Sequence, residues 1–339
     1  MYRASCIYFL MYLRDYSINN IDDKMKNLDV VVVGELNADL ILTGLIAVPE
    51  IGQNKLSKDM HFTLGSSSAI FASNIAKLGL KVGFIGKVGD DYLGEFILKS
   101  LHENHVDTDK IIKDKNAKTG ICVSFSFPGD YAMASYPGVR ESFKLADIDF
   151  DYISRAKHLH MSSYYLQPGM QEGCSELFKR AKEAGLTTSL DPGSDPHGIW
   201  NNSIFDVLEY VDVFLPNEQE ALNISRCADI KSALSRLNET VKTAVIKAGK
   251  NGVWAMDHTG KIHLDGFKVD VVDTTGAGDS FNSGFIYKYL RNSDVETCTL
   301  WGNACAALST TQLGGISGFP CINKLQEFLS KIHKELGYP

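Results

Sequence analysis

The chain has 339 residues, with 41 acidic and 34 basic side chains and a formal net charge of −7. Its hydrophobic fraction of 44% and charged fraction of 22% are typical of a globular protein with a substantial core. The acidic balance, without a dense Lys/Arg stripe, argues against a nucleic-acid-binding protein, and no apolar run reaches the length of a membrane span.

The cysteines and the N-terminal segment bear on location and on the extent of the domain. The seven cysteines are scattered and form no C-x-x-C pair, which favours a reducing, cytoplasmic location. An apolar block, Cys6–Leu13, is followed by Arg14 instead of the cleavage site of a signal peptide. We expect either that Met25 is the working initiator or that residues 1–24 are a loosely attached extension, and we expect residues 25–339 to form the folded domain.

The first predicted strand, Leu28–Val33, is a β-branched run ending at Gly34, which is typical of a buried parallel strand. Asn37 and Asp39 follow it, and the further glycines of a dinucleotide fingerprint are missing. Ligands bind beyond the carboxyl ends of strands in open α/β sheets. Asp39 is therefore a candidate for binding sugar hydroxyls, with an Asx-turn residue as the alternative.

Two β-rich segments interrupt the βα alternation. Residues 40–64 contain short alternating pieces, and residues 117–138 contain a hairpin pattern around Pro128–Asp130. We predict that both segments form a small antiparallel sheet that projects as a lid. The alternative is that they extend the central sheet.

A glycine–serine loop lies between these two segments. Gly65, Ser66 and Ser67 precede a predicted helix that runs through Leu78. The loop offers an N-cap together with donors for a polyol.

From about residue 156 the alternation returns. The predicted strands are His158–Ser162, Thr187–Leu190, Val211–Leu215 and Ala244–Lys247, and the predicted helices are 170–184, 295–310 and 322–336. Asn217 and Glu220 lie three residues apart at a helix start and share a face. Their oxygens suit Mg²⁺ held mostly through water, and an N-cap with its capping-box partner is the alternative.

The segment Asp273–Phe281 carries the strongest functional signal. A predicted strand, Phe267–Val272, precedes it and an apolar-periodic helix follows, so free N–H groups and a helix dipole meet at its glycines. Such a turn binds an anion, typically phosphate. Asp279 beside it is a candidate general base for phosphoryl transfer to a hydroxyl, and a helix-capping Asp is the alternative.

These polar groups share one property: each follows a strand end or opens a helix. One sheet edge would bring together Asn37 with Asp39, Asp191, Asn217 with Glu220, and Asp279. A hydroxyl substrate, a metal–nucleotide and a base must meet at such an edge.

The ordered set of motifs resembles the ribokinase-like (PfkB) family of carbohydrate kinases over residues 28–320. The matching pieces are Asn37-Ala38-Asp39, the Gly65 loop, Val88-Gly89-Asp90-Asp91 with Gly94, Asn217-Glu218-x-Glu220, Gly249-x-x-Gly252 and Asp273-Thr-Thr-Gly-Ala-Gly-Asp279. The resemblance implies a three-layer sandwich with a mostly parallel central sheet and a small β-sheet lid.

The resemblance also implies an ATP-dependent sugar kinase that uses Mg²⁺ and, in some members, a monovalent cation such as K⁺. Asp279 would be the base, and the N–H groups of Gly276, Ala277 and Gly278 the anion hole. The sugar residues would be Asn37, Asp39, Gly65, Ser66 and Ser67, and the nucleotide residues Lys247, Gly249, Gly252 and Asn303. Asn217 and Glu220 match the Mg²⁺ motif, and Asp273 and Thr275 match part of the cation site. By analogy, lids of this kind pair in homodimers.

Three positions depart from the family pattern. Ser66 stands where the substrate loop usually has its second glycine, and Ile70 where it usually has Asn. Arg140 stands where several members carry a small or amide residue. These departures affect the identity of the sugar, and they leave the phosphoryl-transfer motif intact.

Two other functions fit the same motifs. The first is a nucleoside kinase of the same superfamily, and the second is a sugar-binding protein that has lost catalysis. A Walker-type kinase and an H-E-x-x-H metallohydrolase are disfavoured because neither motif occurs in the chain.

Overall fold

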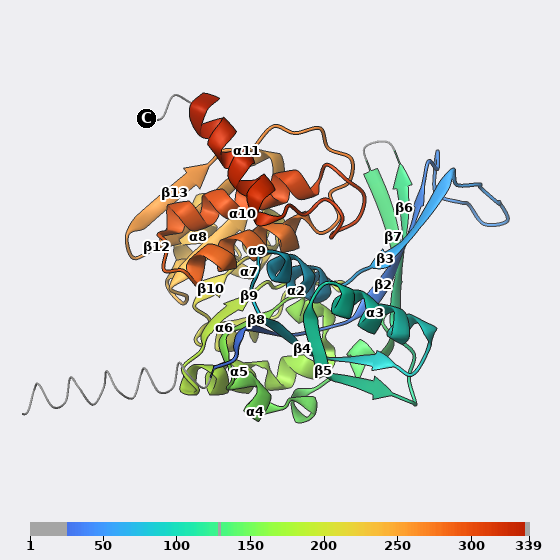
Figure 1. The fold of residues 1–339 in the computed structure, drawn as a ribbon, viewed down its shortest axis with the longest axis horizontal. Coiled ribbons are helices and arrows are strands. Elements are labelled where there is room, and N and C mark those ends of the chain that lie inside the picture. The colour runs from blue at the N-terminus through green and yellow to red at the C-terminus, as the bar shows by residue number, and fades with distance from the viewer. Residues whose placement is uncertain (1–25, 128–129, 336–339) are drawn as a thin grey trace, which may run out of the picture.

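A large sheet forms the middle layer of the computed structural model, which describes residues 26–127 and 130–335 (Figure 1). Its strand order is β13-β12-β11-β10-β9-β8-β1-β4-β5, and all neighbours pair parallel except β11 with β12 and β12 with β13, which pair antiparallel. The strands are β1 (Leu28–Val33), β4 (Val82–Gly89), β5 (Val106–Asp114), β8 (Ala156–Met161), β9 (Thr187–Leu190), β10 (Val213–Phe214), β11 (Thr243–Lys247), β12 (Val253–Asp257) and β13 (Gly260–Leu264).

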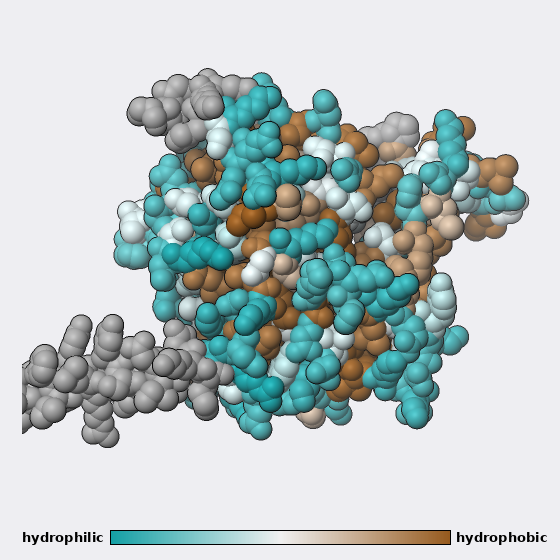
Figure 2. Space-filling view, viewed as in Figure 1, coloured by the Kyte–Doolittle hydropathy of each residue, from teal (hydrophilic) through white to brown (hydrophobic). Residues whose placement is uncertain are grey.

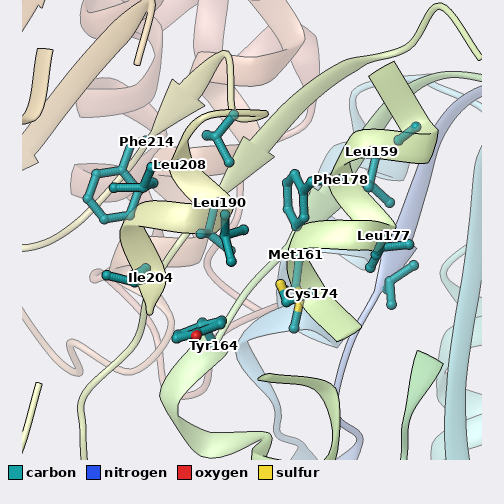
Figure 3. Close-up of a cluster of buried hydrophobic side chains, with 14 of the residues drawn as sticks. Leu159, Met161, Tyr164, Cys174, Leu177, Phe178, Leu190, Ile204, Leu208 and Phe214 are labelled. Atoms are coloured by element: carbon teal, nitrogen blue, oxygen red, sulfur yellow. Dashed lines mark hydrogen bonds between the residues drawn. The ribbon is translucent and has the colours of Figure 1, made fainter. Parts of the chain in front are cut away.

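The central strand β1 is buried on both faces, as its β-branched sequence predicts. Because side chains alternate along a strand, Val31 and Val33 pack into one hydrophobic cluster, while Val30 and Val32 pack into another on the opposite face. Figure 3 shows part of the first cluster, in which Phe178 and Leu190 lie among other buried apolar side chains. The sheet is thus covered on both sides, which makes three layers.

Helices contribute to both clusters. The helices on the Val31 face are α4 (Phe150–Ile153), α5 (Pro168–Glu183), α6 (Ile204–Leu208), α7 (Glu218–Ser225) and α8 (Ile230–Asn238). Those on the Val30 face are α2 (Ser67–Lys77), α3 (Tyr92–Glu103), α9 (Ala277–Tyr289) and α10 (Val295–Ser309). The last helix, α11 (Ile322–Glu335), packs against α10 through a third cluster that includes Trp301 and Leu325.

A second, smaller sheet stands apart at the right of Figure 1, with the order β3-β2-β6-β7. Its strands are β2 (Asn37–Thr43), β3 (Asp59–Leu64), β6 (Gly120–Phe127) and β7 (Asp130–Tyr136). β2 and β6 pair parallel, and the other pairs are antiparallel. The strands therefore form a separate sheet and do not extend the central one, but the expectation that this sheet is wholly antiparallel is wrong. The loop between β2 and β3 projects furthest, and Figure 2 shows hydrophobic atoms there, in agreement with the high exposure of Ile46, Ile51 and Leu56.

Two expectations about secondary structure differ from the fold. The predicted strand Phe267–Val272 is wrong, because this segment has no regular structure and Val271 and Val272 are exposed. Strands β5, β12 and β13 were not predicted.

The expected extension, residues 1–24, lies outside the described residues. Within the described ranges, no helix has the length and apolar character needed to cross a membrane.

Candidate active site

A cavity of about 620 Å³ lies where the second sheet faces the N-termini of α2 and α9. The predicted site residues that line it are Asn37, Asp39, Ser66, Ser67, Asp273, Thr275, Gly276 and Asp279. The residues predicted for the nucleotide and Mg²⁺ do not line this cavity. The structure thus brings together the predicted sugar residues, the predicted base and the predicted anion-binding turn that begins at Asp273. This turn is called the phosphate turn below.

Asn37 and Asp39 form one unit on strand β2. The side-chain amide of Asn37 donates to Asp39 Oδ1 at 2.8 Å, and Asp39 pairs with Thr63 of β3. Asp39 is therefore a strand residue, and the Asx-turn alternative is wrong. Gly65 leaves room for this pair, since a Cβ there would lie 2.1 Å from Asp39 Oδ1. Burial, opposed by the hydrogen bond from Asn37 and reinforced by the charge of Asp273, raises the pKa of Asp39 to about 7.

Ser66 retains the backbone conformation that suits the glycine usual at its position. Its φ is 68°, in the left-handed region that favours glycine. Its hydroxyl donates to the Glu35 carbonyl at 2.6 Å and accepts from the Ala69 N–H at 3.0 Å, capping α2. These bonds compensate the strained conformation of a non-glycine residue.

Glu35 is a site residue that the sequence reasoning missed. It lines the cavity, is 3% exposed, and accepts a hydrogen bond from Ser68 Oγ at 2.8 Å. Burial raises the pKa of this carboxyl. The signal was present in the sequence, because Glu35 is a charged residue placed directly after a buried strand and Gly34.

Asp279 lies in the first turn of α9, where the N-cap is Gly276 with a φ of 70° and without a side-chain cap. The capping alternative for Asp279 is therefore wrong. The carboxyl is 7% exposed, and burial raises its pKa well above the ordinary range; Asp191 and Glu35 add to this, and Lys247 opposes it. The Ala277 N–H donates to Thr274 O at 3.1 Å, whereas helix geometry leaves the Gly278 N–H without an intrahelical acceptor.

Lys247 lies at the phosphate turn, held by two partners. Its Nζ is 2.6 Å from Asp191 Oδ2 and 3.2 Å from Asn282 Oδ1, and the Asn282 amide also donates to Asp191 Oδ2 at 2.6 Å. A Cβ built on Gly278 would be 3.5 Å from Lys247 Nζ. The ammonium group therefore adds positive charge where the α9 dipole already favours an anion. The role of Asn282 was not predicted.

Asn217 and Glu220 form a reciprocal capping box at the start of α7. The Glu220 N–H donates to Asn217 Oδ1 at 2.9 Å, and the Asn217 N–H donates to Glu220 Oε2 at 2.8 Å. The capping alternative is thus confirmed. Burial and the charge of Asp191 raise the pKa of Glu220 to about 7, against the opposing charge of Lys247.

Asn217 and Glu220 could hold Mg²⁺ with little direct contact between the protein and the metal. Residues 26–127 and 130–335 contain no cluster of three or more His, Cys, Asp or Glu side chains able to hold a metal. The capping box uses Glu220 Oε2, and Oε1 accepts no hydrogen bond from the described residues. One carboxylate oxygen together with water and phosphate is a usual environment for Mg²⁺ in phosphoryl-transfer proteins.

Apart from Lys247, the residues predicted to bind the nucleotide lie near one another. Gly252 and Asn303 converge on one segment: a Cβ on Gly252 would lie 1.9 Å from Leu264 O, and the Asn303 amide donates to Asp265 O at 2.7 Å. Gly249 opens the short turn η4 (Gly249–Asn251) beside Gly252.

Asp273 and Thr275 organise the phosphate turn. Asp273 Oδ1 accepts from the N–H and the hydroxyl of Thr275 at 2.9 and 2.8 Å, and Oδ2 accepts from the Gly314 N–H at 2.8 Å. Ile70, where the family usually has Asn, packs near Gly276 and Gly315.

Solved structures share this arrangement of elements. A ribokinase of Arabidopsis thaliana complexed with ribose and ATP matches with a TM-score of 0.78 at 23% identity, over 89% of this chain and 98% of that chain. An E. coli structure assigned as ribokinase II, in complex with ATP and Mg²⁺, matches with a TM-score of 0.81 at 23% identity, over 90% of this chain and 99% of that chain. The fold is therefore ribokinase-like.

The model of the pfkB family of carbohydrate kinases matches residues 27–321, and the chain belongs to this family. The resemblance inferred from its motifs is thereby confirmed. Related proteins are an uncharacterized sugar kinase of Archaeoglobus fulgidus, 30% identical over 73% of this chain and 98% of that protein, and a 5-dehydro-2-deoxygluconokinase of Geobacillus kaustophilus, 29% identical over 91% and 96%. An ATP-dependent ribose-1-phosphate kinase of Halopiger xanaduensis is 29% identical over 89% and 98%.

Proposed function

We propose that the protein is an ATP-dependent sugar kinase in which Asp279 is the general base. The observation that carries this proposal is the position of a buried carboxylate beside a helix N-terminus, in one cavity with the Asn37–Asp39 pair. The sugar hydroxyl transfers its proton to Asp279 while its oxygen bonds to the γ-phosphorus of ATP. The bond between that phosphorus and the bridging oxygen breaks, and ADP leaves with the electron pair.

The other residues bind and orient the reactants. Asn37 and Asp39 would hold sugar hydroxyls, supported by Gly65, Ser66 and Ser67. The N–H groups of the Gly276–Gly278 turn, with Lys247 beside them, would stabilise the charge of the transferred phosphoryl group. Residues of the predicted nucleotide group are Lys247, Gly249, Gly252 and Asn303.

Metal ions would act around the phosphates. Mg²⁺ neutralises phosphate charge when it is bound with ATP, and Asn217 and Glu220 would hold it largely through water. Asp273 and Thr275 would belong to a monovalent-cation site of the kind found in some family members.

The same proposal covers the organisation of the chain. Residues 25–339 would act as one cytoplasmic kinase domain, with the second sheet as a lid over the sugar. The exposed apolar side chain of Met60 on that sheet favours pairing of two lids in a homodimer.

A coupled ADP-release assay across pentoses, hexoses, sugar acids, sugar phosphates and nucleosides tests the function. We expect turnover with a sugar, and we expect Asp39→Ala to raise the KM for that sugar far more than the KM for ATP. Turnover confined to nucleosides would instead identify a nucleoside kinase. Absence of turnover with every acceptor, from protein that binds sugar, would identify a binding protein without catalysis.

The dissociation constant of the sugar, measured without ATP, should depend on pH around the pKa of Asp39, which is about 7. Above that pH the ionised carboxylate accepts hydrogen bonds from two hydroxyls, so binding should strengthen by up to about tenfold between pH 6 and 8. The folded protein holds this proton between the ordinary pKa of 3.8 and about 7, so the free energy of unfolding falls as pH rises through that window.

Calorimetric titrations at several pH values, with Asp39→Asn as the comparison, measure this dependence. The Asn variant keeps a polar side chain that does not titrate, so its sugar affinity should change little around pH 7. An unchanged pH dependence in Asp39→Asn would assign the titration to another carboxyl of the cavity.

A further inference from the structure

Arg140 is the one cationic side chain among the described residues that line the cavity. It lies on the 3₁₀ turn η1 (Gly138–Glu141), directly after β7 of the second sheet. Its Nε is buried without a hydrogen-bond partner, and within the described part of the chain its guanidinium forms no ion pair. The residue as a whole is half-buried, so the burial of this one N–H donor without a partner is unfavourable while the rest of the guanidinium stays accessible.

Two buried cations of this protein have a carboxylate partner. Lys247 contacts Asp191 at 2.6 Å, and Lys87, whose side chain is 9% exposed, contacts Asp147 at 3.0 Å. Arg140, which is half-buried, has no such carboxylate partner in the ranges that the structure describes.

Glu35, the acidic neighbour of Arg140, has hydrogen-bond partners of its own. Its carboxylate accepts a hydrogen bond from Ser68 Oγ at 2.8 Å and lies 3.3 Å from Ser66 Oγ, whose hydroxyl donates to the Glu35 carbonyl. Arg140 attracts this carboxylate, but the two groups do not form an ion pair. The guanidinium donors therefore remain available to a ligand.

The backbone that carries Arg140 is held firmly. Val139 is fully buried, and its N–H donates to Lys118 O at 2.9 Å. Gly138 has a φ of 59°, and a Cβ there would lie 2.4 Å from Lys118 O. Because its backbone is anchored, the arginine cannot easily move away from the cavity.

Arg140 lies on the sugar side of the cavity. Both Asp39 and Arg140 lie close enough to Cys122 of β6 to affect the pKa of its thiol: the charge of Asp39 raises it and that of Arg140 lowers it. Ser163 lies near Glu35. The hydroxyls of Ser124 and Ser126, which also line the cavity, have no hydrogen-bond partner among the described residues. Small donors thus accompany the free guanidinium at the wall formed by β6.

We propose that the sugar phosphorylated by this enzyme carries an acidic group, a carboxylate or a phosphate, and that Arg140 binds it. The inference rests on the proposed sugar-kinase function. A planar guanidinium matches the two oxygens of either group. The cavity also contains the carboxyls of Glu35, Asp39, Asp273 and Asp279, and each of them that is ionised repels an anionic sugar, so such a sugar needs a cation among its binding groups.

Paired ligands test this proposal. Binding to the full-length protein is measured by calorimetry for a panel of sugar acids and sugar phosphates, each beside its uncharged parent, such as gluconate beside glucose and ribose 5-phosphate beside ribose. ADP release is measured with the same panel. We expect at least one charged sugar to bind about 10²-fold more tightly than its parent, and the pair concerned distinguishes carboxylate from phosphate.

Arg140→Gln should abolish most of that preference by weakening binding of the charged sugar while leaving its neutral parent unchanged, and Arg140→Lys should restore part of it. Arg155→Gln is the matched control, because Arg155 is exposed and lies outside the cavity. Equal weakening of charged and neutral sugars in Arg140→Gln would overturn the proposal, as would wild-type preference for the neutral member of every pair.

Different results would contradict the sugar-kinase function and the inference about Arg140. ADP release with neutral sugars alone would overturn the inference about Arg140 and leave the sugar-kinase function standing. Tight, Arg140-dependent binding of a charged sugar without ADP release would support the role of Arg140 in binding an acidic group and would contradict the sugar-kinase function.

Discussion

Asp279→Asn is expected to lower kcat by about 10²-fold or more, the usual effect of removing a general base. The amide has nearly the same shape as the carboxyl, so the reactants should still bind, but it cannot accept the hydroxyl proton. Burial disfavours the charge of Asp279, as its raised pKa indicates. The Asn variant should therefore unfold at the same temperature as the wild type or at a higher one.

Single-turnover phosphorylation tests the predicted loss of kcat in Asp279→Asn. Thermal unfolding tests its predicted stability. Asp109→Asn serves as the control, because Asp109 is an exposed residue of β5 at the edge of the large sheet. It should keep wild-type kcat. An Asp279→Asn enzyme that retains most of its turnover would remove Asp279 from the role of base.

Lys247→Met is expected to reduce kcat by about 10²- to 10³-fold, the range observed when one stabilising donor is removed from a developing charge. The ammonium group lies beside Gly278, close to the position where the transferred phosphoryl group would be held. Its loss also leaves Asp191, which is 7% exposed, without a cation. The free energy of unfolding should fall by about 3 kcal/mol as a consequence.

A second substitution separates catalysis from stability. In Lys247→Met/Asp191→Asn no uncompensated charge remains, so stability should recover while kcat stays low. Lys87→Met is the matched control: it breaks the buried Lys87–Asp147 pair at 3.0 Å, away from the cavity, and should lower stability but not kcat. Recovery of turnover in the double variant would show that Lys247 acts only by holding the fold.

The parallel sheet and the sugar side of the site could be predicted because their signals are local. Leu28–Val33 and Thr187–Leu190 coincide with β1 and β9, since short β-branched runs bounded by turns specify buried strands directly. Asn37 and Asp39 were placed at the correct sheet edge for the same reason. The predicted strand at Phe267–Val272 failed because nothing in the local pattern shows that β13 already ends the sheet.

The polar contacts between distant segments could not be predicted from local patterns. Lys247, Asp191 and Asn282 are far apart in the chain, and only the sheet order brings β9, β11 and α9 together. The buried state of Glu35 likewise depends on the serines of α2. Asn217 and Glu220 show a further limit, because a capping box and a metal ligand pair have the same sequence pattern.

The connection between the two sheets has a mechanical consequence. β1 ends at Val33 and β2 begins at Asn37, so the three residues 34–36 join the central strand of the molecule to the smaller sheet, and the other connections, residues 65–66, 115–119 and 137, are also short. Asn37 and Asp39 belong to that smaller sheet, whereas Asp279 belongs to a helix on the large one. If the smaller sheet moved outward, Asn37 and Asp39 would move away from Asp279. Binding of the sugar by Asn37 and Asp39 and alignment of its hydroxyl with Asp279 would therefore occur in a single step.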